Sequence, residues 1–316
     1  MDFAGRSVAV VGLVADNMPL IRYLVNHGAN ITVLDKQGPE DLQNNLEQLK
    51  DIPVKYHLGP DFLQYLPDYD EVYISPCHQP ELTAALEKNV KFLNEMELFF
   101  QLSPAPIIGT TDSGGRVTTA ALIGLILKRC FQVWIGGSSG RSPISFLPEL
   151  TPEGKVVLEL NSLQLQGMEA SPQIAVITNV TPNQPDIHKD MAEYIDATAR
   201  ILRFQSPQDR AVLNWDNEVN RQVAGETPAR IYYFSRKRPL LEGAFIRDGE
   251  LILRLNQVDE VICKESEIRL SGVHNLENIL AAALASRLAG ASLAAIHSVV
   301  TSFTGVEDHL EFVQGT

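Results

Sequence analysis

Residues 107–129 constrain the fold most, because they place a short strand, a glycine-rich loop and an apolar helix in that order. Ile107-Ile108 leads into the loop at 109–115 (GTTDSGG), and an apolar helical stretch runs from Val117 to Arg129. A strand that passes through a glycine-rich loop into a helix is the layout of phosphate-binding loops in α/β proteins. The sequence therefore predicts a P-loop-type α/β domain around this unit.

The N-terminal residues predict a second parallel sheet. An apolar run at Ser7–Leu13 is followed by helical spacing at Asn17–His27 and by another apolar run at Asn30–Leu34, which ends on Asp35. This β-α-β order favours parallel strands and a Rossmann-like domain. Two further strands, at Glu71–Ile74 and near Val90–Phe92, and a helix between them at Glu81–Lys88 extend the same pattern.

A domain boundary is predicted at Ser103-Pro104-Ala105-Pro106, where two prolines in four residues indicate a linker. A length of 316 residues agrees with two domains, since domains hold roughly 100–200 residues each. We therefore expect one domain at residues 1–104 and a second at residues 105–316.

The second domain continues as alternating strands and helices. Its predicted elements are strands at Val156–Leu160 and Ile174–Asn179, a helix at Asp190–Arg203, β-rich residues at Arg230–Gln257, and helices at Leu276–Ala289 and Ala291–Phe303. Within the β-rich residues, Asp248-Gly249 predicts a tight hairpin turn.

Composition excludes several classes of function. Asp and Glu outnumber Lys and Arg by 39 to 26, a net charge of −13, so no basic nucleic-acid-binding surface is expected. Cys77, Cys130 and Cys263 form neither a CxxC pair nor an even disulfide set. The sequence shows no signal peptide and no apolar run of bilayer length. A cytoplasmic protein without a membrane span is expected.

The loop at 109–117 departs from a standard P-loop in its chemistry. Arg116 stands where a lysine normally binds phosphate, and Val117 stands where a Ser or Thr hydroxyl normally binds Mg²⁺. Asp112 adds a negative charge inside the loop. Arginine can still pair with phosphate. These residues leave both anion binding and a plain glycine-rich turn open.

A second candidate nucleotide site lies at the first strand–helix turn. Residues Gly12–Asn17 (GLVADN) occupy the place of a dinucleotide fingerprint but retain only one of its glycines. Asp35 could accept hydrogen bonds from a ribose or a base. The alternative is an ordinary carboxylate at the end of a strand.

Polar side chains also follow the strands of the second domain. They are Glu159, Ser162, Gln164, Asp186 and His188. Ligands of α/β sheets bind where the carboxyl ends of strands face one crevice. Taken together, and beside a P-loop-like turn, these residues indicate a site at that edge of the sheet.

Several longer segments, read in order, carry a family resemblance. The most specific are VVLELNSLQLQ (Val156–Gln166), SPQIAVITNVTPNQPDIH (Ser171–His188), LSGVHNLENILAAALA (Leu270–Ala285) and SFTGVEDHLEFV (Ser302–Val313). Supporting segments are NEMELF (Asn94–Phe99), SPC (Ser75–Cys77) and GGSSG (Gly136–Gly140). The chain resembles the Mur ligases, and among them the MurD type, which adds D-glutamate to UDP-N-acetylmuramoyl-L-alanine with ATP.

The resemblance implies three domains: an N-terminal UDP-binding domain, a central ATPase domain and a C-terminal domain. It also implies an acyl phosphate on the substrate carboxylate, which the amine of the amino acid attacks. Charge develops on the transferred phosphoryl group, so ATP and Mg²⁺ are the implied cofactors. Thr316 falls where the third domain would begin, and we expect that domain to be absent from this chain.

The resemblance also implies roles for individual residues. Those implied to act in catalysis are Arg116, Glu159, Asp186 and His188, with Glu159 as a metal ligand. Those implied to bind ATP are Gly109, Thr110, Gly114, Gly115, Arg116, Thr118, Asn275 and Asn278. Those implied to bind the UDP-linked substrate are Ala15, Asp16, Asp35, Lys36, Ser75 and Ser138.

Several family positions hold unsuitable residues. The metal-binding hydroxyl falls on Val117, the histidine near the second metal on Gln184, and the carbamylated lysine on Thr198. The HR pair that contacts ATP becomes Asp308-His309. Because these groups act as one unit on the phosphoryl group, we expect a ligase with little or no ATP-dependent activity.

Two alternatives stay open. In the first, the ligase is active and Arg116, Asp112 and Asp186 take over the phosphate and metal contacts. In the second, the chain is a non-catalytic UDP-sugar-binding or scaffold protein, for instance a partner subunit of another ligase. Nucleotide and UDP-sugar binding distinguish them, because a ligand that binds the native state raises its stability.

Overall fold

The computed structural model describes residues 3–75, 92–138, 140–181 and 188–306, and the chain divides into two compact units. The N-terminal unit comprises Met1–Leu102 together with Ile144–Pro148. The central unit comprises Ser103–Pro143 together with Glu149–Thr316. The helix predicted at Glu81–Lys88 lies outside the described residues.

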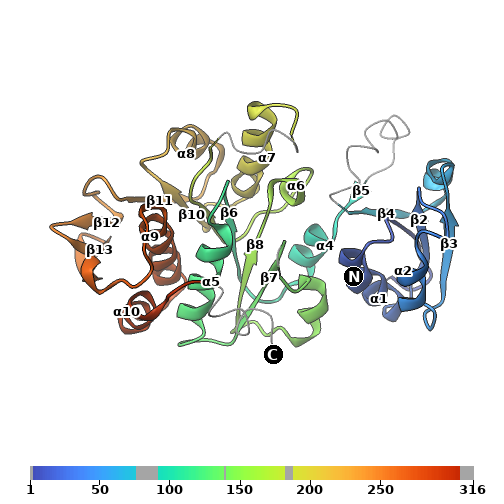
Figure 1. Ribbon diagram of the computed structural model, residues 1–316, viewed down its shortest axis with the longest axis horizontal. Helices are drawn as coiled ribbons and strands as arrows, with labels where there is room; N and C mark the ends of the chain where they lie inside the picture. Colours follow the sequence, from blue (N-terminus) through green and yellow to red (C-terminus); the bar gives the residue numbers. More distant parts are fainter. Residues whose placement is uncertain (1–2, 76–91, 139, 182–187, 307–316) are drawn as a thin grey trace. The chain divides into compact units, whose positions relative to one another are not determined.

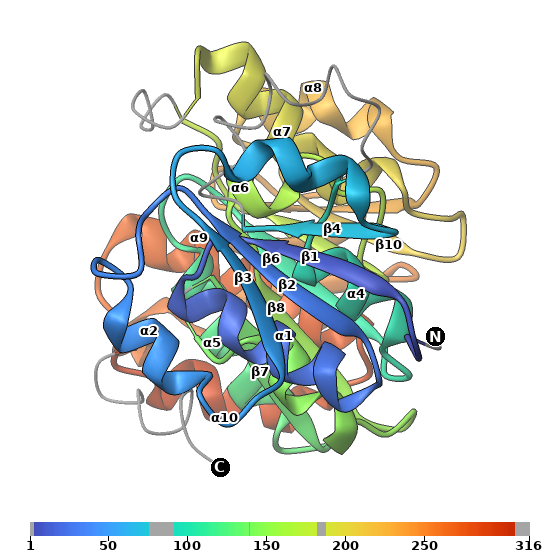
Figure 2. The same ribbon diagram turned by 90° about the vertical axis from the view of Figure 1, so that its right-hand side faces the viewer.

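The N-terminal unit contains a parallel five-stranded sheet in the order β3-β2-β1-β4-β5 (Figure 2). Its strands are β1 (Ser7–Val11), β2 (Asn30–Asp35), β3 (Val54–Leu58), β4 (Glu71–Ile74) and β5 (Phe92–Leu93). The β-branched, apolar residues of β1 and β2 are almost all buried, as strands covered on both faces require. The carboxyl ends of β1, β2 and β4 therefore lie at one edge of the sheet, where the predicted UDP-side residues follow them.

Among its described residues, three α-helices accompany this sheet: α1 (Met18–Asn26), α2 (Gln43–Gln48) and α4 (Glu95–Leu102). In α1, Leu20, Ile21 and Leu24 recur at helical spacing and are buried, so one face of the helix packs inward. Pro19 lies in the first turn, where a missing backbone N–H costs no helical hydrogen bond. The predicted β-α-β unit is confirmed.

The central unit contains a nine-stranded sheet in the order β14-β13-β12-β11-β10-β9-β6-β8-β7 (Figure 1). Neighbouring strands pair in parallel from β7 at one edge of the sheet as far as β12. Strand β13 pairs antiparallel with both β12 and β14. Their bounds are β6 (Ile107–Thr111), β7 (Val133–Gly137), β8 (Lys155–Glu159), β9 (Ile174–Ile177), β10 (Arg210–Asn214), β11 (Arg230–Ser235), β12 (Gly243–Arg247), β13 (Glu250–Leu255) and β14 (Val258–Lys264).

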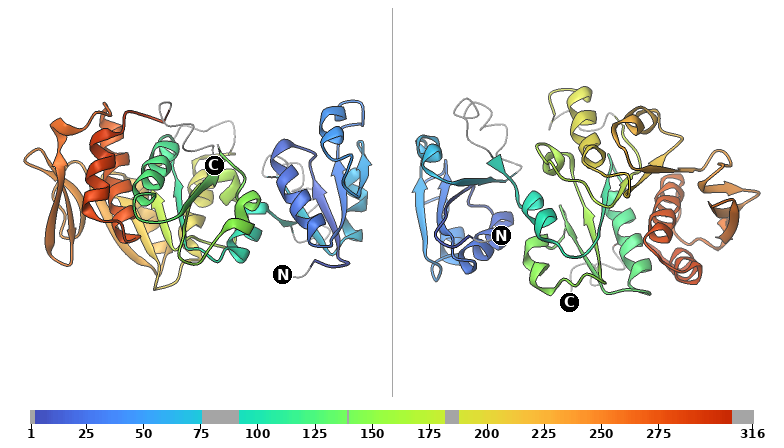
Figure 3. Two further views of the ribbon diagram at one scale, coloured as in Figure 1. Left: turned by 90° about the horizontal axis from the view of Figure 1, so that it is seen from below. Right: turned by 180° about the vertical axis from the view of Figure 1, so that it is seen from behind.

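In the described part of the central unit, six α-helices accompany the sheet: α5 (Arg116–Leu127), α6 (Ser162–Leu165), α7 (Met191–Arg203), α8 (Glu218–Val223), α9 (Val273–Leu288) and α10 (Leu293–Ser302). Helices α5, α9 and α10 pack against one another and form one hydrophobic cluster with the sheet (Figure 3). Helices α5 and α9 are apolar on nearly all sides, because each lies between the sheet and other helices. This packing fixes the first turn of α9 beside the loop after β6.

The α/β fold class predicted from the sequence is confirmed: a Rossmann-like parallel sheet is followed by a P-loop-type α/β unit. The hairpin predicted at Asp248-Gly249 joins β12 to β13, and both residues have positive φ (52° and 76°), as a type I′ turn requires. Strands β3, β7, β10 and β14 and helices α2, α4, α6 and α8 were not predicted. These elements are short, and their positions in the sheets depend on contacts with distant strands.

Among the described residues, no helix is both long and apolar enough to cross a membrane.

Candidate functional site

The loop between β6 and α5 has the geometry of a phosphate-binding loop, and Gly115 makes that geometry possible. Its φ is 152°, which favours glycine. A β-carbon at this position would lie 2.7 Å from Asn278 Oδ1 and 2.8 Å from Asp112 Oδ2, so the loop leaves no room for a side chain. The first N–H groups of α5 consequently face the interior of the loop.

The structure brings the predicted ATP-side residues of this unit to the same place. Gly109 and Thr110 lie in β6, and Thr110 Oγ1 donates a hydrogen bond to the backbone carbonyl of Arg116 at 3.3 Å. Gly114, Gly115 and Thr118 form the loop and the first turn of α5. From α9, Asn278 approaches Gly115 and donates to Asn275 Oδ1 at 3.4 Å.

The Asp112 side chain occupies the interior of this loop. Its exposed fraction is 3%, and its carboxylate accepts hydrogen bonds from the backbone N–H groups of Gly114 and Arg116 and from Thr178 Oγ1, the last at 2.7 Å. Burial raises the pKa of Asp112 above its ordinary 3.8, although these hydrogen bonds and the charge of Arg116 act in the opposite direction. The sequence indicated a charge inside the loop, and it gave Asp112 a contact with phosphate or metal only in the alternative of an active ligase.

Arg116 pairs with Glu159 across the ends of the two neighbouring strands β6 and β8. Arg116 Nε donates to Glu159 Oε1 at 2.9 Å, and Ser138 Oγ donates to the same oxygen at 2.9 Å. Gly137 permits the approach of Ser138, since a β-carbon at Gly137 would lie 2.0 Å from the carbonyl oxygen of Glu159. The predicted metal ligand is therefore held by a guanidinium and a hydroxyl.

These residues do not suit a divalent metal ion. The carboxylate of Glu159 already faces the positive charge of Arg116, and Val117 offers no oxygen ligand. No group of three or more His, Cys, Asp or Glu side chains that could hold a metal occurs in the part of the chain that the structure describes. Asp186 and Gln184 lie outside that part.

Hydroxyl groups occupy the side of the loop that faces α7. Ser113 Oγ lies 2.9 Å from Tyr194 Oη and donates to the carbonyl of Thr181 at 3.1 Å. Thr198, which the family resemblance aligns with a carbamylated lysine, is buried on α7, and its Oγ1 has no hydrogen-bond partner among the described residues. Burial is the main cause that raises the pKa of Tyr194, so this region keeps neutral hydroxyls.

His188 lies against the start of α6 and not in the loop. Its Nε2 is 2.7 Å from Ser162 Oγ, and both side chains are buried. Its Nδ1 has no hydrogen-bond partner among the described residues. Burial lowers the pKa of His188, and this favours a neutral ring that packs in the core beside Tyr194.

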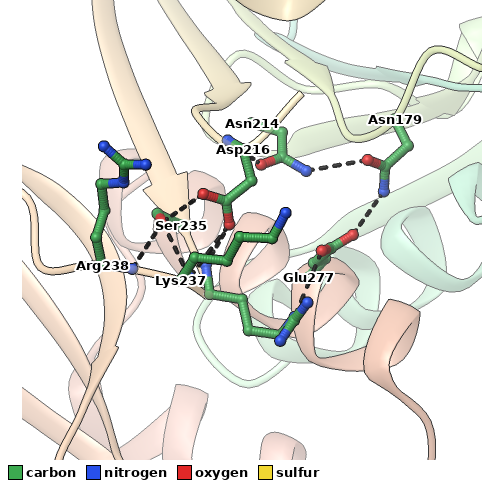
Figure 4. A network of polar contacts seen from close by, with 8 residues as sticks. Asn179, Asn214, Asp216, Ser235, Lys237, Arg238 and Glu277 are labelled. Atoms are coloured by element: carbon green, nitrogen blue, oxygen red, sulfur yellow. Dashed lines mark hydrogen bonds and ion pairs between the residues drawn. The ribbon is translucent and has the colours of Figure 1, made fainter. Parts of the chain in front are cut away.

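A polar network joins the strand ends of β9, β10 and β11 to α9 (Figure 4). Asn179 Nδ2 donates to Glu277 Oε2 at 2.8 Å, and Asn214 Nδ2 donates to Asn179 Oδ1 at 3.0 Å. Arg236 Nε lies 3.6 Å from the other oxygen of Glu277. Sequence reasoning missed these residues, and the available signal was the position of Asn179 at the end of a predicted strand.

Asp216 stabilises the basic turn that follows β11. Its carboxylate accepts hydrogen bonds from Ser235 Oγ at 2.8 Å and from the backbone N–H groups of Arg236 and Lys237 at 2.9 and 3.2 Å (Figure 4). The basic turn is thus fixed beside the network that positions the first two turns of α9, which carry Asn275 and Asn278.

In the N-terminal unit, Asp35 fixes the turn after β1. Its carboxylate accepts hydrogen bonds from the backbone N–H groups of Leu13 at 2.7 Å and Gln37 at 2.9 Å. Asn17 donates to the carbonyls of Val11 and Gly12, so its side chain fills the turn where a dinucleotide fingerprint has glycine.

The other residues predicted on the UDP side have different surroundings. Ala15, Asp16 and Lys36 are exposed, and Ser75 is buried at the end of β4. Ser138 belongs to the central unit, where it contacts Glu159.

Two family profiles match the chain. Residues 6–94 match the profile described as Mur ligase MurD-like, N-terminal domain, and residues 111–286 match the Mur ligase middle domain. Among solved structures, UDP-N-acetylmuramate:L-alanyl-gamma-D-glutamyl-meso-diaminopimelate ligase from Neisseria meningitides aligns with a TM-score of 0.60 at 14% identity, over 96% of this chain and 99% of that chain. UDP-N-acetylmuramate-alanine ligase MurC from Thermotoga maritima aligns with a TM-score of 0.54 at 19% identity, over 95% of this chain and 69% of that chain. At these identities the alignments show the shared fold.

Proteins found by sequence comparison are more similar to this chain in sequence than these solved structures are. The UDP-N-acetylmuramoylalanine--D-glutamate ligase of Acetivibrio thermocellus is 42% identical over 313 residues, which cover 98% of this chain and 67% of that protein. The protein of the same name from Symbiobacterium thermophilum is 41% identical over 97% of this chain and 69% of its own length. The chain therefore spans about two thirds of the length of these relatives. From the matched profiles and these relatives, the chain belongs to the Mur ligase family, with N-terminal and middle domains of the MurD type.

Proposed function

We propose that this chain is a MurD-type homologue that binds a UDP-linked muramoyl substrate and in which the ATP-dependent step is impaired. Residues 1–104 form the substrate-binding domain and residues 105–316 the ATPase-like domain. The observation that carries the proposal is the ion pair between Arg116 Nε and Glu159 Oε1 at 2.9 Å. It places a fixed side-chain cation against the carboxylate that the family uses for a metal.

The chemistry of phosphoryl transfer supports impairment. Transfer from ATP requires stabilisation of the charge on the phosphoryl oxygens. A metal ion at Glu159 Oε1 would compete with both Arg116 and Ser138, and the side chain of Val117 offers no oxygen ligand. Loss of one stabilising group costs roughly 2.7–4 kcal/mol of barrier, which is about a hundredfold to a thousandfold in rate. ATP and Mg²⁺ are therefore doubtful cofactors of this chain.

The substrate side has kept more of its structure. Asp35 is buried at the carboxyl end of β2 and holds the N–H groups of Leu13 and Gln37. These contacts keep the turn between β1 and α1 in a fixed position against β2. Substrate binding at this edge of the sheet is the part of the family's function that the arrangement of the N-terminal unit supports best.

Binding and turnover measured on the same protein test the proposal. Calorimetry with UDP-N-acetylmuramoyl-L-alanine should detect binding, and Asp35→Ala should weaken it at least tenfold, whereas the exposed Asp61→Ala should not. ADP release that depends on this substrate and on D-glutamate should fall at least a hundredfold below the roughly 1–100 per second of kinases. Release at an ordinary kinase rate would contradict impairment, and absence of substrate binding would contradict the substrate assignment.

The same ion pair favours a second candidate, a non-catalytic UDP-sugar-binding or scaffold protein. The guanidinium of Arg116 gives the carboxylate of Glu159 a partner within the chain, without a metal or a nucleotide. This candidate predicts stabilisation by UDP-linked ligands without stabilisation by ATP, or a stable complex with a protein partner on co-purification. Thermal shift with ATP, ADP and UDP-sugars, with and without Mg²⁺, separates the two.

A further inference from the structure

The interior of the loop at 112–116 already contains an anion, and that anion is part of the chain. In phosphate-binding loops, backbone N–H groups and the first turn of the following helix point at the phosphate oxygens. Here the N–H groups of Gly114 and Arg116 donate to the carboxylate of Asp112 instead. Thr178 Oγ1, at the end of the neighbouring β9, donates to Oδ2 at 2.7 Å.

The position of the carboxylate leaves little space for a second anion. A β-carbon built on Gly115 would lie 2.8 Å from Asp112 Oδ2, so this oxygen lies directly against the loop backbone at the N-terminus of α5. The N-cap residue of this helix is Gly115, which has no side chain to cap it. The Asp112 carboxylate therefore provides the negative charge that the helix dipole and the loop N–H groups favour.

One oxygen of this carboxylate is left without a hydrogen bond. Asp112 Oδ1 is buried and has no partner among the residues that the structure describes. A side chain selected only to stabilise the loop would satisfy both oxygens, because an unpaired buried acceptor destabilises the fold. The carboxylate thus occupies the interior of the loop although only one of its two oxygens is hydrogen-bonded.

We propose that Asp112 is a built-in occupant of the loop's anion site, and that shortening this side chain lets the loop bind a phosphoryl group. The ligand class, a phosphoryl group, rests on the proposed function of residues 105–316 as an ATPase-like domain. The donors themselves do not depend on it. Removal of the carboxylate leaves the N–H groups of Gly114 and Arg116 and the hydroxyl of Thr178 without their acceptor. It also removes the negative charge that repels an incoming anion.

Variants of Asp112 test this directly, with pyrophosphate and tripolyphosphate as probes in EDTA. Asp112→Gly restores the residue type of a standard loop, and Asp112→Ala serves as an independent variant, because φ at this position is not positive. Asp112→Asn is the matched control, since its amide oxygen fills the same space and can accept hydrogen bonds from the same N–H groups. Calorimetry should give binding to the Gly and Ala variants at least tenfold tighter than to the wild type and the Asn variant.

Two further measurements locate the binding. Amide NMR signals of Gly114 and Gly115 should shift on addition of pyrophosphate to the Ala variant and stay in place in the wild type. Titrations with ATP and with adenosine distinguish binding of a nucleotide from binding of a free phosphate. Equal affinity for ATP and tripolyphosphate indicates that the protein binds the phosphates alone. Both readouts are independent of ligase turnover and of binding of the UDP-linked substrate.

Two results would overturn the inference. One is pyrophosphate binding to the wild type as tight as to the Gly variant, with the same amide shifts. The other is a Gly or Ala variant that melts cooperatively and gains no affinity for either probe. Failure of the UDP-linked substrate to bind would instead bear on the proposed function and leave the inference about Asp112 standing.

Discussion

Arg116 Nε lies 2.9 Å from Glu159 Oε1, so the first residue of α5 is tied to the last residue of β8 by a charge-assisted hydrogen bond. The side chain of Glu159 is 8% exposed and that of Arg116 is 21% exposed. In an ion pair with so little solvent contact, each charge depends strongly on the other, because a buried charge without a partner destabilises the fold. The pair thus stabilises the edge of the sheet at which the family carries out its chemistry.

Replacement of Arg116 should destabilise the fold. Arg116→Gln leaves the carboxylate of Glu159 buried beside a neutral group, and the free energy of unfolding should fall by about 3 kcal/mol, the lower end of the range for a broken buried pair. Urea denaturation measures it. Arg141→Gln breaks the exposed pair with Glu149 and should cost about 1 kcal/mol or less. Equal losses in the two variants would show that burial of the Glu159 pair has no special weight.

Asp112 should make the protein less stable at neutral pH than its neutral analogue. Burial raises the pKa of Asp112 in the folded state above 3.8, so the folded chain holds a proton that the unfolded chain has already lost in the window above 3.8. Stability therefore falls as pH rises through that window. Asp112→Asn should increase the free energy of unfolding at pH 7, and the gain should vanish below pH 3.8. Denaturation at both pH values checks it, and a gain independent of pH would contradict the mechanism.

His188 should contribute stability that is lost in mild acid. Burial lowers the pKa of His188 below its ordinary 6.5, so below pH 6.5 the unfolded chain binds a proton that the folded chain does not. The free energy of unfolding should therefore fall as pH drops from 7 to 5, and His188→Gln should flatten this slope. The exposed His297→Gln is the control and should leave the slope as in the wild type. An unchanged slope in the His188 variant would exclude this histidine as the cause.

Asn179 should be important for stability through two partners at once. Asn179→Ala removes the donor of Glu277 and the acceptor of Asn214, both of which are buried. Loss of these partners should lower the free energy of unfolding by about 1–3 kcal/mol. Asn44→Ala, at an exposed position of α2, should change it by less than about 0.5 kcal/mol. A double-mutant cycle with Asn214→Ala should show non-additive losses, and additive losses would argue against the network.

Sequence patterns predicted the strand–loop–helix unit at residues 107–129 and the first β-α-β unit because each depends on local periodicity and turn chemistry. They also placed Arg116 among the site residues, because it stands at the lysine position of a P-loop-like loop, and Glu159, because it lies near the end of a strand. They gave no sign of the contact between Asn179 and Glu277, which are 98 positions apart. Strand β14 and the network around Asp216 were missed for the same reason: their partners are set by the packing of distant segments.

The sequence by itself determined the fold class, the family and the departures from its metal-binding residues, since these follow from the order and type of residues along the chain. Only the tertiary structure decided what the substituted residues do. In the folded chain, the guanidinium of Arg116 pairs with the carboxylate of Glu159, and the side chain of Asp112 lies in the interior of its own loop. Such outcomes depend on which donors and acceptors meet at the carboxyl ends of β6, β8 and β9, and only the folded chain brings those ends together.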